Sequence, residues 1–257
     1  MPQTHSLARN HLNVVPRGVE HPGSADVPLM DRIVLNIPHA SLTFPFGTCG
    51  WEDGIQREVT RWTDWYTDWL FSSVSRIDAR IIHVTYPFSR FFCDAERLEE
   101  DPLEAVGKGI VYRRFGALER TLSEQDLELA MESYREHRDR LRAALSPGGS
   151  LLVDCHSFPS DLSSVDVCIG VNDGWSRPEE ELLSRTAEHF TSCGYRTAIN
   201  EPYSNSISPE TGFVYWSVMI EINKRCYMNA DVELDIKKAP AMRRCIESWL
   251  LSLLSGS

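Results

Sequence analysis

The sequence predicts a single α/β domain in which helices cover both faces of a mixed, mostly parallel sheet. Short apolar segments alternate along the chain with longer amphipathic ones, which is the pattern of strands connected by helices. The 257 residues are enough to bury one large core. With 42% hydrophobic and 25% charged residues, the composition is that of a globular protein and excludes a disordered or fibrous chain.

The first half of the chain predicts an arm followed by two strands and two helices. Residues 1–30 are rich in His, Pro, Gly and Asn without an apolar period, so we expect an irregular arm ahead of a single α/β domain over 31–257. The first strand, 33–37, ends at Pro38, which cannot donate to a sheet ladder. Apolar periodicity then predicts a helix over 64–75, a strand over 80–85 and a charged helix over 123–145.

The second half continues the alternation. A strand is predicted over 150–154, where Ser-Leu-Leu-Val-Asp follows two glycines. Further strands are predicted over 165–171, 196–200 and 214–222, and further helices over 178–192 and 239–254.

Bulk charge and cysteine usage exclude several classes of protein. The net charge of −11 opposes binding to nucleic-acid phosphates. No apolar run approaches the roughly 20 residues needed to span a bilayer, and no secretory signal pattern opens the chain. The seven scattered cysteines are typical of free thiols. We therefore expect a cytoplasmic protein without nucleic-acid or membrane partners.

Two histidines follow predicted strands. His39 comes after strand 33–37, and His156 comes after strand 150–154. Ligand sites of α/β sheets form beyond the carboxyl ends of the strands, and a catalytic zinc takes three protein ligands, often imidazoles with a carboxylate. The alternative is that each histidine is a hydrogen-bonded core or turn residue.

Asp64 and Asp68 are the candidates for a third, acidic ligand. Four residues apart at the start of the predicted helix, they would share one helix face. Alternatively, Asp64 is the N-cap of that helix and Asp68 a solvated side chain.

Glu221 lies inside an apolar strand, where an unpaired carboxylate is costly to bury. Burial would raise its pKa towards neutrality and suit it to general base catalysis. The alternative is a buried ion pair with Lys224 or Arg225.

Two arginines and a strand end complete the candidates. Arg90 and Arg97 follow a strand beside several phenylalanines; they would suit a substrate carboxylate or a developing oxyanion, or else be surface arginines. Asn200 and Tyr203 lie at the end of a predicted strand, in a segment with turn-forming residues. The alternative is that this segment is only a loop. Cys155 lacks a surrounding glycine-rich elbow, so a thiol hydrolase is not expected.

Four short motifs in this order resemble those of the N-formylglutamate amidohydrolase family, which is related in fold to zinc carboxypeptidases and aspartoacylase. The resemblance extends from about Ile33 to Asn229. The motifs resemble the family's Pro-His-Ser-Gly, Thr-Asp-Trp, Asp-x-His-Ser and Glu-x-Asn-Arg-x-x-Tyr-Met. In this chain they read Pro38-His39-Ala40-Ser41, Thr63-Asp64-Trp65, Asp154-Cys155-His156-Ser157 and Glu221-Ile222-Asn223-Lys224-Arg225-Cys226-Tyr227-Met228.

The resemblance implies one Zn²⁺ per chain and a role for each candidate. His39, Asp64 and His156 would be the metal ligands, with Asp68 as the substitute for Asp64. Glu221 would activate the attacking water and protonate the leaving amine. Arg90 and Arg97 would bind the oxyanion or the substrate's carboxylates, and Asn200 and Tyr203 would shape the pocket.

The expected reaction is hydrolysis of a small, acidic N-formyl or N-acyl amino acid, most specifically N-formylglutamate to glutamate and formate. One departure opposes this specificity: Asp94-Ala95-Glu96-Arg97 stands where the family has Asp-Leu-Asn-Arg, and so places an acid near an anionic substrate. The alternatives are a carboxypeptidase-like zinc amidase acting on peptide or cell-wall fragments, and a catalytically silent binding domain of the same fold.

Overall fold

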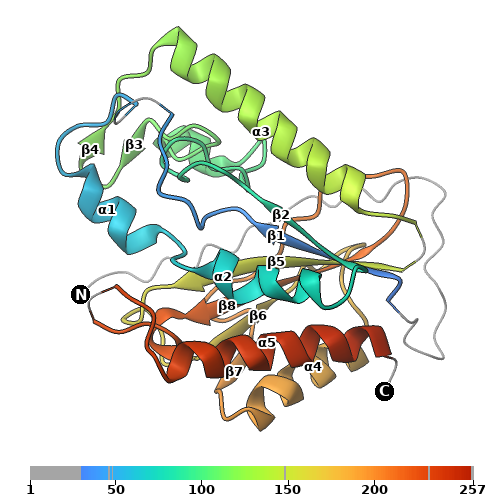
Figure 1. Ribbon diagram of the computed structural model, residues 1–257. Helices are drawn as coiled ribbons and strands as arrows, with labels where there is room; N and C mark the ends of the chain where they lie inside the picture. Colours follow the sequence, from blue (N-terminus) through green and yellow to red (C-terminus); the bar gives the residue numbers. More distant parts are fainter. Residues whose placement is uncertain (1–29, 46, 48, 148, 231, 256–257) are drawn as a thin grey trace.

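A six-stranded sheet in the order β2-β1-β5-β8-β6-β7 organises the protein (Figure 1). This computed structural model describes residues 30–45, 47, 49–147, 149–230 and 232–255. The strands β1 (Arg32–Ile37), β2 (Ile81–Thr85), β5 (Ser150–Phe158) and β8 (Trp216–Asn223) are mutually parallel. The strands β6 (Val167–Gly170) and β7 (Thr197–Ile199) run the other way, because β6 pairs antiparallel with β8. The predicted mixed, mostly parallel sheet is confirmed.

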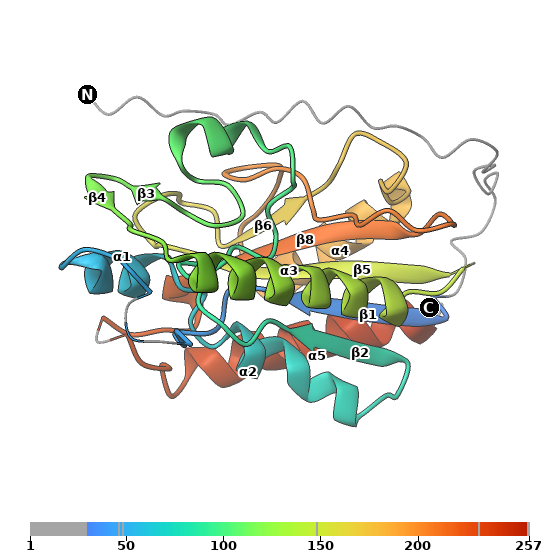
Figure 2. The same ribbon diagram turned by 90° about the horizontal axis from the view of Figure 1, so that it is seen from above.

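Helices cover both faces of this sheet. The long helix α3 (Glu124–Ala144) lies across the strands on one face, as the view from above shows (Figure 2). On the other face lie α2 (Thr67–Phe71), the 3₁₀ turn Ser72–Arg76, α4 (Glu180–Ser192) and α5 (Lys238–Ser255). The arrangement is the α/β architecture predicted from the alternating pattern.

Side chains of β5 show how the sheet divides the core. Leu151, Val153 and Cys155 belong to the large apolar cluster formed with α2, α4 and α5. Leu152 faces the opposite way, into the cluster beneath α3. Because side chains alternate along a strand, the polar residues Asp154 and His156 continue the α3 face towards the carboxyl end of the sheet.

Two of the predicted element boundaries that differ from the structure concern candidate site residues. The predicted helix 64–75 begins at Thr67, because Tyr66 adopts a left-handed conformation with φ 61°. Asp64 therefore precedes the helix and is not its N-cap. The predicted strand 150–154 continues to Phe158 beside β8, where His156 is paired with Glu221. His156 is thus a strand residue, not a strand-end residue.

Several short elements were not predicted. These are α1 (Ile55–Trp62), the hairpin of β3 (Arg114–Phe115) and β4 (Leu118–Glu119), and the 3₁₀ turns Pro102–Val106 and Lys224–Cys226. The segment between β2 and α3 contains the hairpin (Figure 1).

The predicted arm lies outside the described residues up to position 29 and stays a prediction there. Its last residue, Met30, is only 2% exposed and belongs to the core. No helix in the described part of the chain is both long and apolar enough to cross a membrane.

Candidate active site

Two buried histidines meet at the carboxyl end of the parallel strands. His39 lies just past β1, and His156 lies in the adjacent β5, with their ring centroids 5.0 Å apart. They are 1% and 3% exposed. Neighbouring parallel strands therefore bring together the two imidazoles predicted from the sequence.

Asp64 lies between these histidines. Its Oδ2 is 2.8 Å from Nδ1 of His156 and 3.7 Å from Nδ1 of His39. The main chain fixes this position, because the Asp64 amide donates to the His39 carbonyl. Burial opposes ionisation, but His156 and His39 hold the pKa of Asp64 well below its usual range. Asp68, by contrast, lies exposed on α2.

Glu96 contacts the same two histidines. Its Oε1 is 3.1 Å from Nε2 of His156, and its Oε2 is 3.9 Å from Nδ1 of His39. Donor atoms of His39, Glu96 and His156 lie within 4.8 Å of one another, so these residues could hold a metal ion. Sequence reasoning treated Glu96 only as a departure within a motif and missed its place in this cluster.

The donor set fits a metal ion. Nδ1 of His39 is buried and has no hydrogen-bond partner among the described residues. Its other nitrogen, Nε2, lies 2.7 Å from Oδ1 of Asp94. An imidazole held at one nitrogen by a carboxylate, with the other nitrogen unpaired, is typical of metal-binding histidines.

Asp94 joins His39 to the two predicted arginines. Arg90 Nη2 donates to it at 3.1 Å, Arg97 Nε lies 3.3 Å away, and the Tyr112 hydroxyl donates to the same oxygen. Burial opposes its ionisation, but His39, Arg90 and Arg97 keep the pKa of Asp94 well below its usual range. Asp94 is a site residue that the sequence analysis did not single out.

Asp154 plays the corresponding part at the second histidine. Its Oδ1 lies 3.1 Å from Nε2 of His156, and it accepts hydrogen bonds from Asn36 Nδ2 at 2.8 Å and from the Ile207 amide at 3.1 Å. Burial and the charge of Glu96 raise the pKa of Asp154 to about 6. Asn36, a polar residue inside an apolar strand, was the available signal for this network.

Glu221 projects from β8 beside His156. It is 8% exposed, and its Oε2 has no hydrogen-bond partner in the described part of the chain. Burial raises its pKa to about 8. The alternative of an ion pair is wrong, because Lys224 donates to the Arg61 carbonyl and Arg225 pairs with Asp166.

Arg90 and Arg97 are not surface residues, since their side chains are 18% and 11% exposed. Tyr203 packs edge-on against Phe158 with ring centroids 6.0 Å apart; burial and the charge of Glu221 raise the pKa of its hydroxyl. Asn200 is engaged elsewhere. Its Oδ1 accepts a hydrogen bond from the Val171 amide at 2.8 Å, and its own φ is 57°.

Cys155 faces away from the histidine cluster. It is fully buried in the apolar core of the opposite sheet face, and burial raises its thiol pKa well above the usual value. This placement agrees with the expectation that it is not a nucleophile.

Known proteins resemble this chain in sequence and in fold. A profile of the N-formylglutamate amidohydrolase family matches residues 31–228. The chain belongs to this family. The resemblance drawn from the four motifs is confirmed, and the protein is a hydrolase of the kind that acts on amides.

Two solved structures share the fold. The N-formylglutamate amidohydrolase from Ralstonia eutropha JMP134 is 20% identical, with a TM-score of 0.72 over 89% of this chain and 94% of that one. A gene product from Agrobacterium tumefaciens is 17% identical, with a TM-score of 0.58 over 87% of this chain and 92% of that one. No curated protein matches significantly.

Proposed function

We propose that this member of the family is a zinc-dependent amidohydrolase that cleaves small N-formyl or N-acyl amino acids, with N-formylglutamate as the most specific substrate. One observation carries the proposal. Two buried histidines and a carboxylate converge on one point while the unpaired carboxyl of Glu221 lies on the neighbouring strand.

His39, Asp64 and His156 are the proposed ligands. Zinc ligands at about 2.0 Å in tetrahedral geometry lie about 3.3 Å apart, and the Asp64 contacts of 2.8 and 3.7 Å bracket this value. Glu96, with 24% of its side chain accessible, contacts the other ring nitrogen of His156 and is the alternative carboxylate ligand, since its donor atom groups with those of the two histidines. Zinc bound there would polarise the amide carbonyl and lower the pKa of a water molecule.

Glu221 is the proposed proton carrier. Its carboxylate would take a proton from the water that attacks the amide carbon, and would then give that proton to the nitrogen of the leaving amine. In the metal-free protein burial raises the pKa of this carboxyl to about 8, and a carboxyl that titrates near neutral pH suits a group that first accepts and then donates a proton. The charge of Arg90 favours the ionised form that the first step needs.

Arg90 and Arg97 supply positive charge beside the histidines. Both guanidinium groups pair with Asp94, and Arg97 also pairs with Asp101. The further N–H donors of these groups would bind an oxyanion or a substrate carboxylate. The negative charge of Glu96 would oppose the binding of an anionic substrate. Its contacts with His156 and His39 offset part of that charge. Recognition of an acidic amino acid is therefore compatible with the departure at Glu96.

The test compares the wild-type protein with Glu221→Gln on N-formylglutamate, with zinc content measured on the same samples. The variant should keep its zinc and lose most turnover, because the water loses its base but not its activating ion. Retained turnover would exclude Glu221 as the base. Wild-type protein that holds no zinc and hydrolyses nothing would favour the silent-domain alternative.

A further inference from the structure

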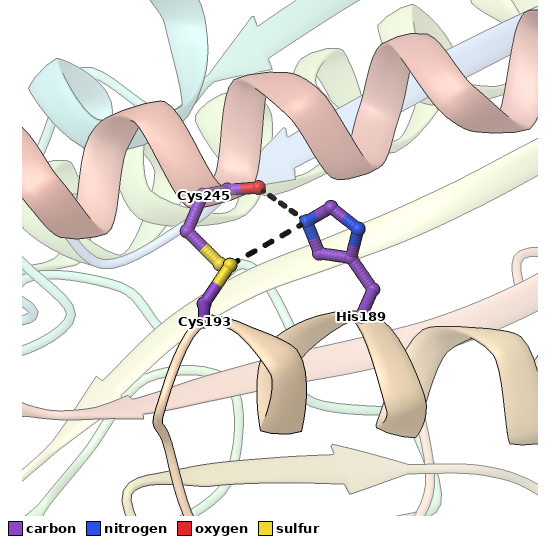
Figure 3. A group of neighbouring side chains, drawn as sticks. All are labelled: His189, Cys193 and Cys245. Carbon is purple, nitrogen blue, oxygen red and sulfur yellow. Dashed lines mark hydrogen bonds between the residues drawn. The ribbon is translucent and has the colours of Figure 1, made fainter.

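A second group of potential metal ligands lies between α4 and α5, on the sheet face opposite the histidine cluster. His189 and Cys193 come from the last turn and the C-cap of α4, and Cys245 comes from α5. Their side chains point towards one another across the helix interface (Figure 3). His189 and Cys193 are four residues apart, so the helix places both on one face.

The distances among these donors suit one small cation. One nitrogen or sulfur atom of each residue lies within 4.8 Å of the others, and Nε2 of His189 is 3.9 Å from Sγ of Cys193. With zinc–nitrogen and zinc–sulfur bonds of about 2.0 and 2.3 Å, tetrahedral ligands would be about 3.5 Å apart. A movement of a few tenths of an ångström would close this gap.

We propose that His189, Cys193 and Cys245 form a second metal site that takes a thiophilic divalent cation of the zinc class. Two thiolates and an imidazole are the donors such ions prefer. Cys193 is exposed and Cys245 is buried, so the cation would enter from solvent and keep one position open. This site is separate from the proposed catalytic one and contains none of its residues.

The hydrogen bonds around His189 allow its Nε2 to exchange a carbonyl partner for a cation. Its Nε2 lies 2.9 Å from the Cys245 carbonyl, and the Ser248 hydroxyl donates to that same carbonyl at 3.0 Å. When Nε2 turns to a cation and its proton moves to Nδ1, Ser248 remains as the donor to the carbonyl. No buried acceptor is left unpaired.

Thiol protonation sets the pH dependence. Burial raises the pKa of the Cys245 thiol, and the adjacent Cys193 raises it further. Binding of one divalent cation to two thiols releases two protons and forms two metal–sulfur bonds, so affinity should increase with pH.

The test is a cadmium titration of reduced, chelator-treated full-length protein, followed by the ultraviolet charge-transfer band that arises only from cadmium–thiolate bonds. The wild type should show the band, and Cys193→Ser, which alters an exposed position, should bind at least tenfold more weakly at this site while its hydrolytic activity is unchanged. His189→Ala should weaken the band in the same way.

The double variant His39→Ala/His156→Ala separates this site from the catalytic one. It should keep the full thiolate band and lose one zinc equivalent. If it loses no zinc, the proposed catalytic site fails, whatever the cysteine variants show. An unaltered band in Cys193→Ser would overturn the second site. So would a Cys193–Cys245 disulfide in the isolated protein combined with no cadmium band after reduction, which would assign the pair to redox chemistry.

Discussion

Removing the charge of Glu221 should stabilise the metal-free protein at alkaline pH. The folded-state pKa of Glu221 is about 8, against 4.5 for an unperturbed glutamate. A raised carboxyl pKa contributes stability that is complete below pH 4.5 and is lost as the pH rises to 8, because the unfolded chain ionises first. At 1.36 kcal/mol per pKa unit, the loss is roughly 3 to 5 kcal/mol. Glu221→Gln keeps the size of the side chain and removes the ionisation.

The assay is urea unfolding of chelator-treated protein at pH 5 and pH 8.5. The free energies of unfolding of wild type and Glu221→Gln should be similar at pH 5, and the variant should be more stable by roughly 3 to 5 kcal/mol at pH 8.5. Glu128→Gln, at an exposed position on α3, should change stability by less than about 0.5 kcal/mol at both values. An effect of Glu221→Gln that is the same at both pH values would refute the assignment of a raised pKa.

Three further predictions concern Asp94, Arg120 and Arg97. Asp94→Asn should lower zinc affinity by about 10- to 100-fold in a chelator competition, because it weakens the support of His39; unchanged affinity would exclude that role. Arg120→Met should destabilise the protein by about 3 kcal/mol or more in urea unfolding. The reason is that the buried guanidinium donates to the carbonyls of Cys49, Phe91 and Phe92. An equally stable variant would show that water replaces these bonds. Arg97→Gln should raise KM for acidic substrates more than for neutral ones, and equal effects would argue against carboxylate recognition.

The sheet was predictable from the sequence because its strands are short apolar runs. The parallel strands β1, β5 and β8 bury nearly every side chain on both faces, which produces continuous apolar segments. The element α1 was not predicted, since it is eight residues long and buries only Ile55 and Val59. The two-residue strands β3 and β4 carry no periodic signal at all.

The positions of the candidate residues were predictable where these residues follow or lie within strands. His39, His156 and Glu221 are positioned by β1, β5 and β8, so strand order alone brings them together. Asp94 and Glu96 come instead from the segment between β2 and α3, whose path depends on long-range contacts such as those of Arg120. Local sequence does not encode such a path, so their contacts with the histidines became visible only in the structure.

The most direct test of the account follows hydrolysis of N-formylglutamate by chelator-treated protein as zinc is returned. We expect no turnover without metal, recovery with zinc in the wild type, and no recovery in His156→Ala. Zinc-dependent hydrolysis of other N-acyl amino acids alone would keep the metal and change the substrate. Full turnover in the metal-free protein, or equal recovery in His156→Ala, would contradict the proposed metal site.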